Sequence, residues 1–201
     1  MQTPSTPSSL LHTMFYQITS LLLEVVAGLL AGTCLLRLYM QYQRIPMSAR
    51  SGNPLAKFIF ALTDWVVLPL RRVIPAAGRW DMASLVGAFL IQLAQFLILW
   101  VVLGMGMSLV SVFVLAAFGL LRMAISGMTG LVIIYAVLSW VQTESAAADL
   151  LERLVMPVLI PIRRVLPLVG GIDLSPLVLL VLLQVSAIVL GSMQAAVLVA
   201  L

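Results

Sequence analysis

The chain has 201 residues, of which 63% are apolar and only 9% are charged, and its mean hydropathy is +1.18. A soluble domain has about 45–50% apolar and about 25% charged residues, so this composition excludes a soluble globular protein. The predicted fold class is therefore an all-α integral membrane protein. The single cysteine, Cys34, and the single histidine, His12, exclude an internal disulfide and a Cys/His zinc site, and no cofactor is expected.

Four apolar runs are long enough to cross a hydrocarbon core about 30 Å thick, and they predict four transmembrane helices. A fifth, shorter apolar segment at residues 107–121 is re-entrant, interfacial or an extension of the third helix. Counting it as a span gives a five-span alternative. The four predicted spans cover about residues 15–40, 83–103, 122–140 and 174–201.

The basic residues set the orientation. Nine of the eleven Lys and Arg residues lie between the first two spans or between the last two, and four spans place both segments on one side. The positive-inside rule then predicts that both basic loops are cytoplasmic and both termini extracytoplasmic. Five spans would separate the two loops, so that alternative is rejected. Residues 1–14 carry no Lys or Arg, so a signal peptide is not expected either.

The chain contains an internal repeat. Residues 57–92 match residues 149–184 at 13 of 36 positions, including a PxRRxxP motif in each copy. Chance matching of apolar runs does not place prolines and arginines in register. We predict two tandem parallel repeats, each a span, an amphipathic cytoplasmic helix, a PxRRxxP turn and a second span. The predicted units are a polar extracytoplasmic tail (1–14), the first repeat (15–104), a connecting apolar segment (105–121) and the second repeat (122–201).

Each amphipathic stretch is expected to lie in the membrane interface and to end at the first proline of its motif, which points the paired arginines toward the lipid headgroups. One interpretation is that these arginines only fix the topology. The other is that they form a joint cationic surface for anionic lipid or a protein partner. No arginine-rich run with interleaved aromatics predicts nucleic-acid binding. The arginines are Arg71 and Arg72 in the first copy and Arg163 and Arg164 in the second.

Asp81 and Asp173 occupy equivalent positions just before the second span of each repeat. An acidic residue there caps the first helical turn and favours the positive end of the helix dipole. Both are therefore predicted to cap the helices that follow them.

Polar residues inside the spans are costly in lipid and need partners. A shift of 98 places Glu24 opposite Arg122, and these two predict an ion pair between the repeats. Arg37 is expected to extend its side chain to the cytoplasmic interface. Gln92, its repeat partner Gln184, and Gln95 are expected to hydrogen-bond between helices. An ion pathway through these positions is the alternative.

Small residues mark faces where helices approach closely. Gly28 and Gly32 form one such face in the first span, and Gly191 lies at the centre of another in the last span. These faces pack within the chain or form a homo-oligomer.

No catalytic set is present in the sequence. It contains no Ser/His/Asp or Cys/His arrangement, no glycine-rich phosphate loop and no paired metal-binding carboxylates. The protein is therefore predicted not to be an enzyme.

The two motif copies, PLRRVIPAAG at 69–78 and PIRRVLPLVGGIDLSP at 161–176, closely resemble the YggT (YlmG) family. The resemblance covers nearly the whole chain, although the first copy has Arg79 and Trp80 where the second has Gly171 and Ile172. It implies a multi-pass protein of the bacterial inner membrane with no established biochemical activity. Members of the family are linked to envelope organisation, cell division, and osmotic or ion homeostasis.

Two functional hypotheses follow. The first is a non-enzymatic membrane scaffold or organiser that engages lipid or partners through its basic amphipathic face. The alternative is a channel or transporter component in osmotic-stress or ion homeostasis, which uses the polar residues of the spans.

Overall fold

The computed structural model describes residues 7–47, 53, 55–74, 78–102, 106, 108–141, 145–166 and 173–201. These residues are all-helical apart from turns and short connections, and four of the helices are long and apolar enough to cross a membrane. The protein is therefore a multi-pass membrane protein, and the predicted number of spans is confirmed. The helices are α1 (Pro7–Tyr42), α2 (Ala56–Val73), α3 (Met82–Val102), α4 (Leu109–Val141), α5 (Ala146–Val165) and α6 (Ser175–Ala200).

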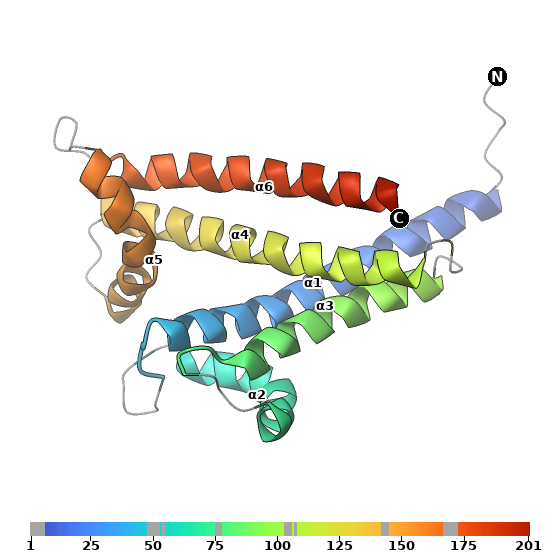
Figure 1. Ribbon diagram of the computed structural model, residues 1–201, viewed down its shortest axis with the longest axis horizontal. Helices are drawn as coiled ribbons and strands as arrows, with labels where there is room; N and C mark the ends of the chain where they lie inside the picture. Colours follow the sequence, from blue (N-terminus) through green and yellow to red (C-terminus); the bar gives the residue numbers. More distant parts are fainter. Residues whose placement is uncertain are drawn as a thin grey trace.

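The four long helices pack as two pairs. α1 packs along α3 and α4 packs along α6, while α4 also contacts α3 and α1 and so joins the pairs. The shorter α2 lies against α1 and α3, and α5 lies against α4 and α6. Figure 1 shows α2 and α5 at the same end of the long helices, with the C-terminus at the other end. Both basic segments of the chain therefore lie at one end of the fold.

The third span begins earlier than predicted. Its helix starts at Leu109 rather than near Arg122, so the short apolar segment extends the third helix. The Ser108 hydroxyl accepts a hydrogen bond from the Ser111 backbone N–H (3.1 Å), which satisfies one donor of the first turn. The first helix already begins at Pro7, although its stretch that is apolar enough to span a membrane begins at Met14. Proline is well suited to the first turn of a helix, where its missing N–H has no partner to lose.

The prediction that the first proline of each motif ends the amphipathic helix is wrong. Pro69 lies inside α2 and Pro161 inside α5, so both arginine pairs belong to the last helical turn. Each helix ends two residues before the second proline of its motif, and the next residue, Ile74 or Leu166, adopts extended backbone angles. A residue that precedes proline is sterically pushed out of the helical region, which explains these ends.

Small residues bring the two pairs of long helices together. The side chain of Met123 on α4 lies 3.6 Å from the position a Cβ would take at Gly28 and 3.8 Å from that at Gly32. Gly119 of α4 lies closer still to α3, against Gln92 and Phe96. The Gly28 and Gly32 face is therefore used for packing within the chain.

The last span contributes least to the core. No atom lies within 4 Å of the position a Cβ would take at Gly191, and Gln184 lies on the exposed face of α6. Within the described part of the chain, Gln184 makes no side-chain hydrogen bond, so the expected interhelical bond at this position is not formed. Gln92, in contrast, is buried and its amide lies 3.8 Å from the Met123 sulfur.

The close approach at Gly119 gives a stability prediction. A Cβ there would lie 2.9 Å from Gln92 Oε1 and 3.0 Å from Phe96 Cε2, so Gly119→Leu must displace these side chains and disturb the contact between α3 and α4. We expect a loss of about 1–3 kcal/mol, read as a lower unfolding temperature in detergent. Gly130→Leu on the same helix is the control, because the space around Gly130 is open. Equal unfolding temperatures for the two variants would contradict this packing.

Candidate functional site

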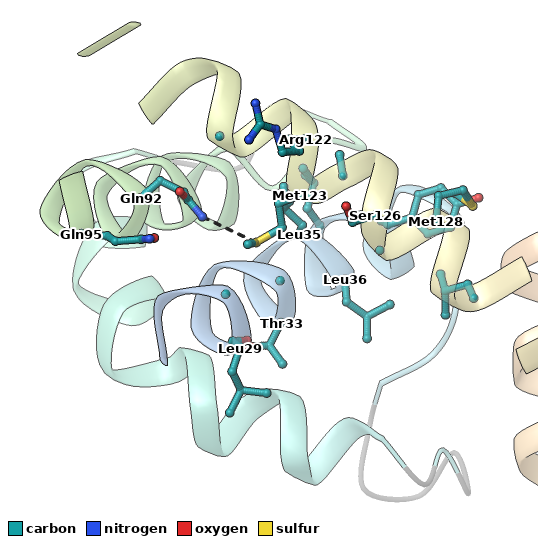
Figure 2. Close-up of a pocket in the computed structure, with 18 of the residues that line it drawn as sticks. Leu29, Thr33, Leu35, Leu36, Gln92, Gln95, Arg122, Met123, Ser126 and Met128 are labelled. Carbon is teal, nitrogen blue, oxygen red and sulfur yellow. Dashed lines mark hydrogen bonds between the residues drawn. The ribbon is translucent and has the colours of Figure 1, made fainter. Parts of the chain in front are cut away.

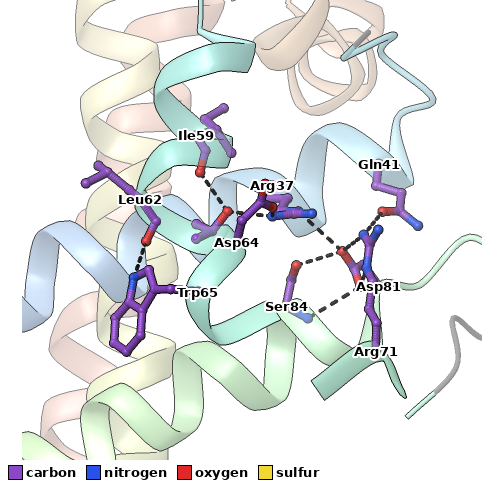
Figure 3. A network of polar contacts seen from close by, with 10 residues as sticks. Arg37, Gln41, Ile59, Leu62, Asp64, Trp65, Arg71, Asp81 and Ser84 are labelled. Atoms are coloured by element: carbon purple, nitrogen blue, oxygen red, sulfur yellow. Dashed lines mark hydrogen bonds and ion pairs between the residues drawn. The ribbon is translucent and has the colours of Figure 1, made fainter. Parts of the chain in front are cut away.

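A buried ionic cluster lies where α2 meets the ends of α1 and α3 (Figure 3). Arg37 of α1 is only 2% exposed, and its Nη1 donates to Thr63 Oγ1 at 2.6 Å and to Asp64 Oδ1 at 2.7 Å. Its Nε lies 3.8 Å from Asp81 Oδ2 without a hydrogen bond. The expectation that Arg37 reaches out to the interface is therefore wrong, because two carboxylates hold it inside the protein.

Asp81 is the acceptor at the centre of the cluster. Its side chain is completely buried, and it accepts hydrogen bonds from the guanidinium of Arg71 and from the Ser84 hydroxyl at 2.6 Å. Arg71 also donates to Gln41 Oε1 at 3.1 Å. One arginine of α2 thus connects the end of α1 to the start of α3.

The charge state of Asp81 follows from these contacts. Burial alone would raise the pKa of this carboxyl, but the hydrogen bonds from Arg71 and Ser84 outweigh it and hold the pKa below its usual range. Asp81 is therefore ionised, and its negative charge balances the buried Arg37 and the partly exposed Arg71 beside it.

The second half of the chain, α4 to α6, contains a similar arginine–aspartate ion pair with fewer charged groups around it. Arg163 of α5 pairs with Asp173 at 2.6 Å and donates to the Tyr135 hydroxyl at 3.1 Å. Burial opposes ionisation of Asp173, but a hydrogen bond from Ser175 and the nearby Arg163 lower its pKa. Hydrogen bonds to Tyr135 and Asp173 raise the pKa of Arg163 against the opposing effect of burial. Both groups are charged.

In both halves the arginine and the aspartate are ten residues apart, and the next arginine is free to face outward. Arg72 and Arg164 are exposed, and within the described residues neither forms an ion pair or a side-chain hydrogen bond. The four arginines expected to reach the headgroups thus divide into two that tie the fold together and two that point out. The repeated spacing of ten was the sequence signal for this division.

The two aspartates also bond to the helices that follow them. Asp173 Oδ1 accepts a hydrogen bond from the Ser175 backbone N–H at 2.9 Å, and Asp81 Oδ1 accepts a longer one from the Ser84 N–H at 3.4 Å. Each aspartate therefore contacts the first turn of its span as well as the arginine ten residues before it.

The halves differ at the remaining positions of the cluster. At the sequence shifts that relate the repeats, Arg37 corresponds to Tyr135, and Asp64 corresponds to Met156. The Met156 sulfur lies 3.0 Å from Arg163 Nη1, so it occupies a comparable place without a charge. The first half therefore holds four charged groups, whereas the second holds one ion pair supported by a phenol and a thioether.

A groove of about 950 Å³ lies between α1, α3 and α4 (Figure 2). Most of its lining is apolar, with Gln92 and Gln95 from α3 among the polar exceptions. Glu24 and Arg122 both line it but do not form the predicted ion pair. Arg122 instead donates to Gln194 Oε1 of α6 at 2.6 Å. The predicted partner of Arg122 is thus wrong, because α6 is nearer to its guanidinium.

The described residues contain no group of three His, Cys, Asp or Glu side chains that would hold a metal ion. Cys34 is buried among apolar residues of α1, α2 and α3.

Because Asp81 and Asp173 are buried to different extents, we predict that the same substitution at each costs a different amount of stability. Asp81→Asn leaves Arg71 without its carboxylate partner and leaves Arg37 with Asp64 alone, and because Asp81 is completely buried we expect a loss of about 3 kcal/mol of stability. Asp173 is 28% exposed and its arginine 34%, so Asp173→Asn should cost only about 1 kcal/mol. Unfolding temperatures in detergent compare the two variants. A larger loss for Asp173→Asn would contradict the assigned geometry.

Comparison with known proteins identifies the family of this chain. The model of the CCB3/YggT family matches residues 14–102 and 114–194. The chain is 35% identical over 165 residues to the uncharacterized protein YggT of Escherichia coli K12, which covers 82% of this chain and 84% of that protein. It is 33% identical over 175 residues to an uncharacterized protein of Vibrio alginolyticus, covering 86% and 92% of the two chains. No solved structure matches. The chain belongs to the CCB3/YggT family.

Proposed function

We propose that this protein is a non-enzymatic organiser of the bacterial inner membrane, with α2 and α5 at the cytoplasmic surface. In this proposal the two helices bind anionic lipid headgroups and thereby create a local site for envelope or cell-division partners. The observation that carries it is the placement of both amphipathic helices at one end of the long helices, each with an outward-facing arginine in its last turn.

The charge at this end supports binding to an anionic surface. Its exposed cations outnumber the exposed acidic residues of α5, which are Asp149 and Glu152. Arginine near an anionic leaflet contributes about 1 kcal/mol, so several together fix a helix at the membrane surface. The positive-inside rule places this end in the cytoplasm. The exposed cations are Arg44, Lys57, Arg72, Arg79, Arg153 and Arg164.

The proposal includes a duplicated helical unit. The equal spacing of Arg71 to Asp81 and of Arg163 to Asp173 supports it, as do the two stretches matched by one family model. Each unit has a span, an amphipathic helix and a second span in the same order. Two such units related by an axis along the membrane normal present their arginine pairs, at the ends of α2 and α5, to the same leaflet.

The alternative, a component of an ion or osmotic pathway, requires a continuous polar path between the units. The groove between α1, α3 and α4 lies in the right place but is lined mainly by apolar side chains. Glu24 and Arg122 are the charged residues among its described lining, and the residues that line it nearest α2, Tyr39, Tyr42 and Trp80, are uncharged. We therefore prefer the organiser.

The test replaces the two outward arginines. Arg72→Gln with Arg164→Gln should weaken binding of phosphatidylglycerol to the purified protein by about 30-fold, from about 1 kcal/mol for each arginine. Native mass spectrometry of the detergent-solubilised protein, titrated with the lipid, measures this affinity. Raising the salt concentration should weaken binding to the unaltered protein in the same way.

The matched control is Arg72→Lys with Arg164→Lys, which keeps both charges and should keep most of the binding. The unfolding temperature should stay unchanged in both double variants, because neither arginine contributes an ion pair within the described residues. Undiminished phosphatidylglycerol binding by the Gln variant would refute the headgroup role.

A further inference from the structure

Glu24 of α1 and Arg122 of α4 are opposite charges within membrane spans, and neither forms an ion pair within the described residues. Both side chains are exposed, and both line the groove between α1, α3 and α4. We propose that two copies of this chain associate through the groove, with Glu24 of each copy paired with Arg122 of the other. This inference does not rest on the proposed function, which concerns lipid headgroups at α2 and α5.

Contacts between the long helices place both charges deep in the hydrocarbon core. Gly28 and Gln92 are the middle residues of the first two spans, and Met123, next to the middle of the third, lies against both. Glu24 comes four residues before Gly28, which is about 6 Å along the helix. Arg122 comes directly before Met123 and is therefore about 1.5 Å from the same level. The core extends about 15 Å to each side of its middle, so neither charge reaches the headgroups.

The two charges lie at similar depths and on the same side of the middle. α1 and α4 cross the membrane in the same direction, because one span, α3, lies between them in the chain. The levels of the two residues differ by about 4.5 Å at 1.5 Å per residue. A helical side chain tilts toward the N-terminus of its helix, so the long Arg122 side chain extends toward the level of Glu24. Two copies related by a twofold axis along the membrane normal keep each residue at its own depth, so the two charges can meet.

A second copy supplies the partner that each charge lacks. Charged side chains inside the membrane are costly and almost always pair or face a cavity. Within the described residues, Arg122 uses one nitrogen, Nη2, to donate to Gln194, which leaves other N–H donors of the guanidinium for a carboxylate. An isologous interface brings each member of a pair against the other member in the partner copy. Because one groove carries both signs, such an interface forms two ion pairs.

The surface around both charges is open to a second copy. The groove has a volume of about 950 Å³. Gly127, five residues after Arg122, also lines it, and a Cβ added there meets nothing within 4 Å. On α1, Leu21 and Val25 lie near Glu24 in the sequence and are 60% and 61% exposed. These side chains are therefore available to contact another chain.

Charge reversal in separate copies tests the pairing between chains. Glu24→Arg in every copy places two arginines at each contact, and Arg122→Glu places two carboxylates there. Each variant alone should therefore dimerise at least about tenfold more weakly than the unaltered protein. A mixture of the two variants restores opposite charges at both contacts. With a different affinity tag on each variant, co-purification of the coexpressed pair in mild detergent should recover to within about twofold of the unaltered protein.

A pair formed within one chain cannot produce this recovery, because each copy in the mixture still carries two like charges. Arg72→Gln with Arg164→Gln should leave dimerisation unchanged, which separates this interface from the proposed headgroup surface.

A second comparison tests the interface without changing any charge. Gly127→Phe fills the open space of the groove and should weaken dimerisation at least about tenfold. Gly130→Phe, on the same helix and equally open, lies outside the lining residues and should leave dimerisation within about twofold. Native mass spectrometry gives the ratio of dimer to monomer. The unfolding temperatures of both variants should match, because neither substitution meets a neighbour within its own chain.

An unaltered protein that is monomeric in lipid nanodiscs would overturn the proposal. So would equal dimerisation of Gly127→Phe and Gly130→Phe, or no recovery in the mixture of reversed variants. A different membrane protein bound at the groove in place of the second copy would also overturn it. If a reversed variant does not accumulate in the membrane, the comparison of Gly127→Phe with Gly130→Phe decides the outcome.

Discussion

The contact on which the rest of this structure depends is the pairing of an arginine with an aspartate ten residues later. It ties the last turn of α2 to the start of α3, and the last turn of α5 to the start of α6. Asp81 is completely buried in this contact and Asp173 partly. Because the arginine is fixed on one side of its helix, the following residue of the chain, Arg72 or Arg164, must face outward. The ion pair thus determines which cation is available to a partner.

The arginine–aspartate pair has different surroundings in the two halves. The first adds Arg37 and Asp64, so that two carboxylates and two guanidinium groups hold each other around the buried Arg37 and Asp81. Such a cluster is costly to disrupt, because removing one partner leaves an uncompensated charge. The second half has Tyr135 and Met156 beside Arg163, and its aspartate, Asp173, is 28% exposed. We infer that α2 is held firmly against its spans, whereas α5 separates from its spans at lower cost.

The number of spans was predictable, because long apolar runs follow directly from the requirements of lipid. The hydrogen-bond and ion-pair partners of the charged side chains were not predictable, because they depend on which helices lie side by side. Arg37 looked like a residue that reaches the interface because its carboxylate partners are distant in sequence. Arg122 was assigned to Glu24 although Gln194 of α6 lies nearer. Pro69 was expected to end a helix, yet proline is tolerated there, and the residue before the next proline ends it.

The central claim is that both arginine pairs, Arg71–Arg72 and Arg163–Arg164, face the same leaflet of the membrane. Cysteine accessibility in intact cells tests it most directly. Val73 and Val165, the last residues of α2 and α5, are 80% and 81% exposed, and Ser108 lies at the opposite end. Each is replaced by Cys in a Cys34→Ala background and treated with a membrane-impermeant thiol reagent. We expect labelling at position 108 from outside, and labelling at 73 and 165 only after the cells are opened. Labelling of 73 and 165 from opposite sides would contradict the claim.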